Sequence, residues 1–392
     1  MAKRHKYQVG LLGKPGGTEK RLLQLIRKGF KDLGIRSGLL SVLRDDEISD
    51  RDRKAPFVLI YFGSSGPPSA ETLQTLDELL EDSVPIFPCV DDLTKFNALV
   101  PSAISAINGL DLSKAGALEH LTGFVLQAFR LLRTTRRLFI SYRRSETQAV
   151  AIQLYEELDQ RNFDVFLDTH SVAPGEPFQE VLWHRLADTD VVILLDSPGF
   201  QERRWTMDEL AQANATTLQV LQLLWPDQKS TAPAAFSQFF PLSKGSFEDK
   251  KVSIGPDARL KKAAVDKICA ATESLRARAL AARYRNLVDY FCDTAWDMGM
   301  VPVVQQGRFI EVAAKSGAQA LVIPAVGIPD AVLNQNIEVE FQSQRKSNKQ
   351  IWLLYDERGV RNVWQEHLAW LNQYAPVQCV QVAECEAQLR GL

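Results

Sequence analysis

The feature of this sequence that most constrains its fold is a repeated alternation of short apolar segments with longer helical patterns. Segments rich in β-branched and aromatic residues, such as PFVLIYFG (56–63) and DVVILLD (190–196), are separated by stretches of helical periodicity. This alternation is typical of parallel strands that are joined by helices covering the sheet. It predicts an α/β fold.

The alternation occurs in three successive groups. A length of 392 residues exceeds what one ordinary core accommodates. We therefore expect three open parallel-sheet units with covering helices, at residues 1–133, 134–280 and 281–392. The predicted strands are 7–13, 38–44, 56–63 and 84–90 in the first unit, 136–144, 163–168, 190–196 and 218–225 in the second, and 301–306, 320–326, 350–357 and 377–383 in the third. Within the second unit, 226–251 looks irregular. A long helix is expected over about 258–298, and the boundary to the third unit lies inside it.

Composition excludes several classes of protein. Hydrophobic residues make up 45% of the chain, which suits a globular protein, and the net charge of −2 argues against a nucleic-acid binder. No apolar run approaches the roughly 18 residues that span a bilayer, and the N-terminus lacks a signal-peptide pattern, so we expect a cytoplasmic protein with no membrane contact. The five cysteines are scattered without metal-ligand spacing, which predicts reduced thiols and no metal site.

Three segments of the second unit carry candidate site residues. FISYRRSE (139–146) places Tyr142, Arg143 and Arg144 after a strand, in the crevice where open parallel sheets bind ligands. An arginine there can hold a phosphate, and a tyrosine can stack on a ring or donate to a ribose. FLDTHSVAPGEPFQEVL (166–182) places Asp168 at the end of the next strand and Phe178 at the start of a helix.

The third segment is LLDSPGFQERRWTMDELAQA (194–213), in which Trp205 and Glu209 are four residues apart. On a helix this spacing puts the indole and the carboxylate on one face. A carboxylate beside an aromatic wall is suited to stabilising an oxocarbenium-like transition state, which requires no metal.

In this order, the three segments resemble those of the TIR (Toll/interleukin-1 receptor) domain family, whose sheets are flavodoxin-like. The F-I-S-Y strand, the Pro/Gly loop and the W-x-x-x-E helix carry the resemblance. It implies an NAD+ glycohydrolase with Glu209 as catalytic carboxylate, and with Tyr142, Arg143, Arg144, Asp168, Phe178 and Trp205 around the ligand. NAD+ would be the substrate, and no separate cofactor is implied.

The resemblance also implies a biological setting and partners. Bacterial TIR effectors often deplete NAD+ in antiphage immunity, some forming cyclic ADP-ribose species, and their domains self-associate through the loop that is 169–177 here. Activation would follow oligomerisation or the sensing of a small-molecule or protein activator. The first unit resembles degenerate TIR-like or sensor modules, and the third is interpreted as a sensor or assembly domain.

Alternatives remain open at this point. Glu209 could lie on a solvated helix face, and Phe178 could pack in the core with Leu182 and Leu186. The protein could then be a non-enzymatic TIR–TIR adaptor. It could also be a nucleotide-signal receptor in which a flanking unit binds a nucleotide and the TIR domain only transmits the signal.

Overall fold

The structure is a computed structural model that describes residues 7–33, 35–53, 55–82, 84–129, 131–167, 178–200, 218–228, 237–305, 308–345 and 349–392. For residues 37, 178–180, 237 and 342–345 it describes the backbone only. Across these ranges the strands form three five-stranded sheets. The chain divides into two compact units, one made of residues 1–134 and 260–278 and the other of residues 135–259 and 279–392. The expected division into three domains remains a prediction.

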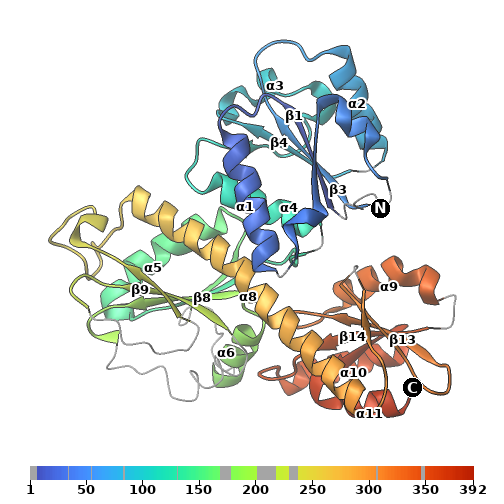
Figure 1. Ribbon diagram of the computed structural model, residues 1–392. Helices are drawn as coiled ribbons and strands as arrows, with labels where there is room; N and C mark the ends of the chain where they lie inside the picture. Colours follow the sequence, from blue (N-terminus) through green and yellow to red (C-terminus); the bar gives the residue numbers. More distant parts are fainter. Residues whose placement is uncertain are drawn as a thin grey trace. The chain divides into compact units, whose positions relative to one another are not determined.

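The sheet of the first unit is entirely parallel, with the order β2-β1-β3-β4-β5. Its strands are β1 (Tyr7–Gly13), β2 (Leu40–Arg44), β3 (Phe57–Phe62), β4 (Ile86–Val90) and β5 (Leu110–Asp111). Its helices include α1 (Thr18–Asp32), α2 (Ala70–Glu81), α3 (Phe96–Leu99) and α4 (Ala117–Ala128). One face of the sheet packs on Leu76 and Leu79 of α2. Helix α1 and the end of α4 cover the other face (Figure 1). There Tyr7, Phe30 and Phe129 make edge and tilted ring contacts.

The second sheet is also parallel and has the order β10-β9-β8-β6-β7. Its strands are β6 (Arg137–Ser141), β7 (Asp164–Leu167), β8 (Val191–Asp196), β9 (Gln219–Leu224) and β10 (Ser237–Pro241). Helix α5 (Arg144–Asp159) joins β6 to β7, and α6 (Phe178–Ala187) precedes β8. Leu182 and Leu186 of α6 pack on alternate residues of the strands, including Phe139 and Val192. Since right-handed crossovers run outward from β6 and then back across it, α5 and α6 cover opposite faces.

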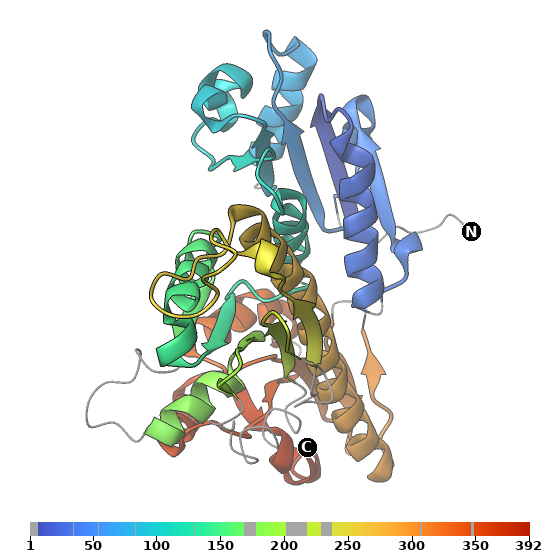
Figure 2. The same cartoon turned by 90° about the vertical axis from the view of Figure 1, so that its left-hand side faces the viewer.

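The third sheet has the order β11-β12-β13-β14-β15 and is mixed. Strands β11 (Val303–Val304), β12 (Ile310–Ala313) and β13 (Gln319–Pro324) pair antiparallel, whereas β13, β14 (Gln350–Tyr355) and β15 (Val377–Gln381) are parallel. One face packs on α9 (Ala331–Arg345) and α10 (Asn362–Tyr374). The other face packs on α11 (Cys385–Arg390) and on the second half of α8 (Lys262–Asp297), which Figure 2 shows as one unbroken helix.

The α/β class with parallel-sheet units is confirmed, with one correction and three omissions. The third sheet is mixed and not fully parallel as predicted, because its first strands form an antiparallel hairpin. The predicted strands also omitted β5, β10 and β12, and β10 lies inside the stretch that was read as irregular. All five cysteines are buried and none forms a disulfide. Among the described helices, none is long and apolar enough to cross a membrane.

Candidate functional site

The second sheet has a topological switch point between β6 and β8. These strands are neighbours, with Ser141 at the end of β6 opposite Leu194, and the helices that join the strands lie on opposite faces. Open parallel sheets bind ligands in the region outside the carboxyl ends of their strands at such a point. This position is therefore the first place to look for a ligand site in the unit.

Three of the predicted site residues lie just after the end of β6. Tyr142 follows the strand and is buried, Arg143 is the extended N-cap residue of α5, and Arg144 begins the helix with an exposed side chain. The guanidinium of Arg143 donates through Nε to Ser145 Oγ at 3.2 Å and through Nη1 to the carbonyl of Gly199. Gly199 belongs to the segment that leaves β8, so Arg143 connects the segments that follow β6 and β8.

Glu146 makes the matching connection. Its Oε2 accepts a hydrogen bond from the backbone N–H of Gly199 at 3.1 Å, and its Oε1 lies 3.5 Å from Nη1 of Arg143. The two charged side chains thus hold both polar groups of one peptide residue, and we call this set of Arg143, Glu146 and Gly199 the Gly199 clamp. A Cβ atom added at Gly199 would collide with both charged groups, so the clamp requires glycine.

A second polar cluster lies at the end of β8. Asp196 and Ser197 are almost completely buried, and Gln222 of β9 donates through Nε2 to Asp196 Oδ2 at 2.7 Å. Burial raises the pKa of the Asp196 carboxyl, and the hydrogen bond from Gln222 opposes that shift. Ser197 Oγ and Gln222 Oε1 have no hydrogen-bond partner among the described residues. Buried unpaired polar atoms are uncommon in a packed core, and both of these belong to residues next to Asp196.

The predicted site residues fall into two groups. Tyr142, Arg143 and Arg144 lie together at the switch point, where the guanidinium of Arg143 contacts protein groups. Asp168, Trp205 and Glu209 lie outside the described residues, as does the side chain of Phe178. Their assigned roles stay predictions.

Sequence reasoning missed Glu146, Gly199, Asp196 and Gln222 as members of this neighbourhood. Glu146 stands inside the quoted segment FISYRRSE, and Gly199 follows the S-P turn of LLDSPGF, so a signal was available for both. The sequence gave no such signal for Gln222. A glutamine in an apolar strand can be recognised as a hydrogen-bond partner of Asp196 only when β9 is known to lie beside β8.

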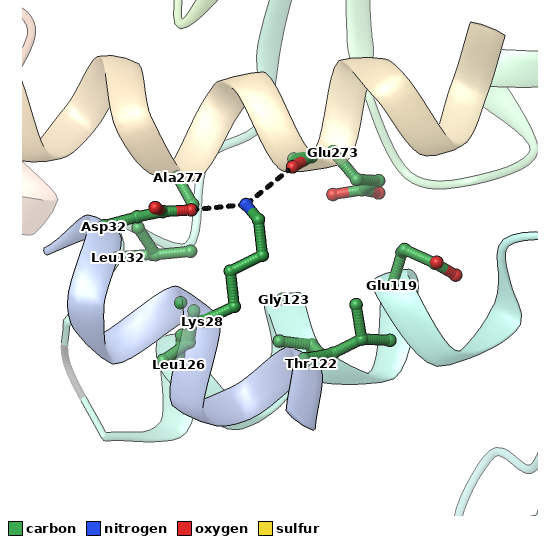
Figure 3. A pocket seen from close by; sticks show the side chains of 12 residues that line it. Lys28, Asp32, Glu119, Thr122, Gly123, Leu126, Leu132, Glu273 and Ala277 are labelled. Carbon is green, nitrogen blue, oxygen red and sulfur yellow. Dashed lines mark hydrogen bonds and ion pairs between the residues drawn. The ribbon is translucent and has the colours of Figure 1, made fainter. Parts of the chain in front are cut away.

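A different crevice occurs in the first unit, between α1, α4 and the first half of α8 (Figure 3). Lys28 extends from α1 and donates to Asp32 at 2.7 Å and to Ser274 of α8 at 3.3 Å. Gly29 lies so close to Leu126 that a Cβ would sit 2.8 Å from Leu126 Cδ1. With a cavity of only about 40 Å³, this is a seam between packed helices.

Comparisons with solved structures give only weak similarities. A protein described as a two-component system response regulator/GGDEF domain protein is 14% identical, with 69% of this chain and 99% of that chain covered and a TM-score of 0.28. The C-terminal domain of glucosamine-fructose-6-phosphate aminotransferase from Francisella tularensis is 11% identical, with 71% and 85% covered and a TM-score of 0.21. Tagatose-6-phosphate ketose/aldose isomerase from Escherichia coli is 14% identical, with 72% and 83% covered and a TM-score of 0.19. Similarities at these scores support no conclusion about function.

A comparison with curated proteins gave no match. A family model does match, and its description is "TIR domain", over residues 138–252. This range begins in β6, includes the Gly199 clamp and ends beyond β10, so it coincides with the second sheet and its switch point. Residues 138–252 are thus a TIR domain, and the chain carries two further sheets with covering helices beside it.

Proposed function

We propose that this protein is an NAD+ glycohydrolase that cleaves the bond between nicotinamide and ribose, with Glu209 as its catalytic carboxylate. The observation that carries the proposal is the Gly199 clamp at the switch point. It fixes the start of the segment that bears Trp205 and Glu209, ten residues further along the chain in the case of Glu209. A clamp of two charged side chains on one peptide restrains the backbone where that segment begins.

The chemistry is compatible with these groups. As the glycosidic bond breaks, positive charge develops on the anomeric carbon and ring oxygen of the ribose, and the Glu209 carboxylate stabilises that charge. Nicotinamide leaves as a neutral base and needs no proton from the enzyme. Water, or another nucleophile within ADP-ribose itself, then takes the vacated position, which would give hydrolysis or cyclisation.

Self-association is part of the proposal. The TIR–TIR contact through residues 169–177 would complete the site, so specific activity should rise with protein concentration. Depletion of NAD+ by clustered protein is the activity that would serve antiphage immunity in the bacterial cytoplasm.

The test is nicotinamide release and NAD+ loss by the purified full chain over a range of concentrations. Glu209→Gln should be folded and inactive. The matched control is Glu156→Gln, which changes an exposed glutamate on α5 in the same way and should keep wild-type activity. If wild type and Glu209→Gln are equally active, Glu209 is not the catalytic group. If the wild type releases no nicotinamide even when clustered, the adaptor function is favoured.

A further inference from the structure

A cavity of about 140 Å³ lies in the C-terminal part of the second compact unit, at the carboxyl ends of β13, β14 and β15. Residues 325–327 follow β13, Asp356 and Arg358 follow β14, and Val382 follows β15. The opposite wall is the second half of α8. Open sheets bind ligands outside the carboxyl ends of their parallel strands, and this cavity occupies that position in the third sheet.

The lining of this cavity combines apolar surface with a net positive charge. Leu287, Val326 and Val382 supply apolar wall, and Tyr290 adds a half-exposed aromatic ring. The charged lining consists of the guanidinium groups of Arg283 and Arg358 and the carboxylate of Asp356, which leaves one positive charge in excess. Such a lining favours a ligand that has an apolar or ring portion and one anionic group.

Arg358 still has donors to offer such a group. Arg358 donates to the Asp356 carboxylate from Nε at 2.8 Å and from Nη2 at 2.5 Å, and these two bonds orient the guanidinium plane. Its Nη1 has no partner among the residues that the structure describes. The pairing with Asp356 raises the pKa of Arg358, so the charge persists at every physiological pH. An arginine held in this way is preorganised to bind a carboxylate or phosphate.

The size of the cavity limits the ligand. A cavity of about 150 Å³ in another protein accommodates a single benzene ring, whereas typical cofactor pockets are about 300 Å³ or larger. The cavity of about 140 Å³ therefore has room for one ring of a ligand and not for a dinucleotide.

The wall of the cavity is also connected to the TIR domain within the same compact unit. Arg283 is 8% exposed and donates from Nη1 to the carbonyl of Thr189 at 2.9 Å and from Nη2 to the carbonyl of Ala187 at 2.5 Å. The N–H of Ile328, next to the cavity segment 325–327, donates to Asp188 Oδ1 at 3.0 Å. Arg283, which lines the cavity, and Ile328, which follows the lining segment 325–327, therefore hold residues 187–189, where α6 ends and the connection to β8 begins.

We propose that this cavity is a binding site for a small ligand that carries one ring and one anionic group, a phosphate or a carboxylate. Binding changes the TIR domain through Arg283, which lines the cavity, and through Ile328, which follows the lining residue Gly327, because both contact residues 187–189. The binding site does not depend on the proposed NAD+ cleavage, since its detection requires no enzymatic activity.

The experiment uses the full chain and three anionic probes: ribose 5-phosphate, benzoate and inorganic phosphate. Ribose and benzamide serve as neutral counterparts. Calorimetry should give saturable binding of one or both ring anions, at least about tenfold tighter than their neutral counterparts, since one charge-assisted hydrogen bond corresponds to roughly that factor. Preference for ribose 5-phosphate identifies a phosphate ligand, and preference for benzoate identifies a carboxylate ligand.

Variants locate the binding in this cavity. Arg358→Gln should weaken binding of the preferred ring anion by about tenfold or more. Arg285→Gln is the matched control, because Arg285 is an exposed arginine on α8, the helix that forms the opposite wall, and does not line the cavity. Hydrogen exchange of residues 187–191 should slow when the ligand is bound to the wild type.

Three results would overturn the proposal. The first is an absence of saturable binding for both ring anions. The second is an affinity for inorganic phosphate equal to that for ribose 5-phosphate, combined with no binding of benzoate. The third is binding that Arg358→Gln and Arg285→Gln leave equally unchanged.

Discussion

Replacement of Gly199 by alanine tests the Gly199 clamp, which connects the segments that follow β6 and β8. The new methyl group would overlap Nη1 of Arg143 and Oε1 of Glu146, so at least one of the two must move away. The displaced atoms are the ends of flexible side chains, so the cost is mainly that of the hydrogen bonds lost, about 1.5–3 kcal/mol for each bond to a charged group. Alanine also lowers the conformational entropy of the unfolded chain, which stabilises the folded state by about 0.4–1 kcal/mol. Because the two charged side chains are partly exposed, we expect a net loss of about 2 kcal/mol.

Thermal unfolding of the full chain, followed by tryptophan fluorescence, measures this loss. For a unit of this size, about 2 kcal/mol corresponds to a fall in Tm of roughly 4–8 °C. The control is Gly245→Ala in the same unit, where the added methyl group would meet only Ser243 Oγ, at an ordinary contact distance of 3.4 Å. Gly199→Ala should also reduce NAD+ cleavage, since it displaces the segment that leads to Glu209. A Gly199→Ala protein as stable as Gly245→Ala would refute the clamp.

Three further changes have defined outcomes. Burial, with Arg185, Arg361 and Arg137 nearby, lowers the pKa of His184 to about 4, so the unfolded chain binds a proton that the folded chain does not. Stability should therefore decline as pH falls from about 6.5 towards 4, and urea titrations of His184→Gln should show a shallower decline. The raised pKa of Asp196 works in the opposite sense, with stability lost as pH rises through the folded pKa. Asp196→Asn should remove that loss and gain about 1 kcal/mol near pH 7, because its amide can donate to Gln222 Oε1; a less stable variant in urea titration would contradict this. Leu353→Ala, at a fully buried position of β14, should cost about 2–5 kcal/mol in the same assay, and a cost under about 1 kcal/mol would show that the third sheet is not tightly packed.

The strands that were predicted correctly share a physical property. Segments such as FVLIYF and VVILLD are buried along their whole length, and a parallel strand covered on both faces reads as a continuous apolar run. Helix α5 shows a similar local pattern, because Ala151, Leu154 and Leu158 recur at helical spacing and all three are fully buried. Patterns of this kind are local, so the sequence contains them in readable form.

The strands that were missed lack that property. β5 has two residues, β10 reads SQFFP, and β12 is a four-residue strand of a hairpin. Each is defined by pairing with a neighbour that is distant in the chain or by a turn, and not by its own apolar content. The mixed character of the third sheet follows from the hairpin and escaped prediction with it.

The amino-acid sequence by itself determined the α/β class, the positions of most strands along the chain and the TIR motifs, because apolar periodicity and short motifs are local properties. Tertiary structure alone decided that Arg143 and Glu146 grip Gly199, more than fifty residues away, and that Arg283 contacts the carbonyls of Ala187 and Thr189. It also placed the cavity of the third sheet beside that contact. These arrangements depend on strand order and on which backbone carbonyls a long side chain can reach. Neither leaves a periodic trace in the chain, since parallel pairing brings together residues that no local pattern connects.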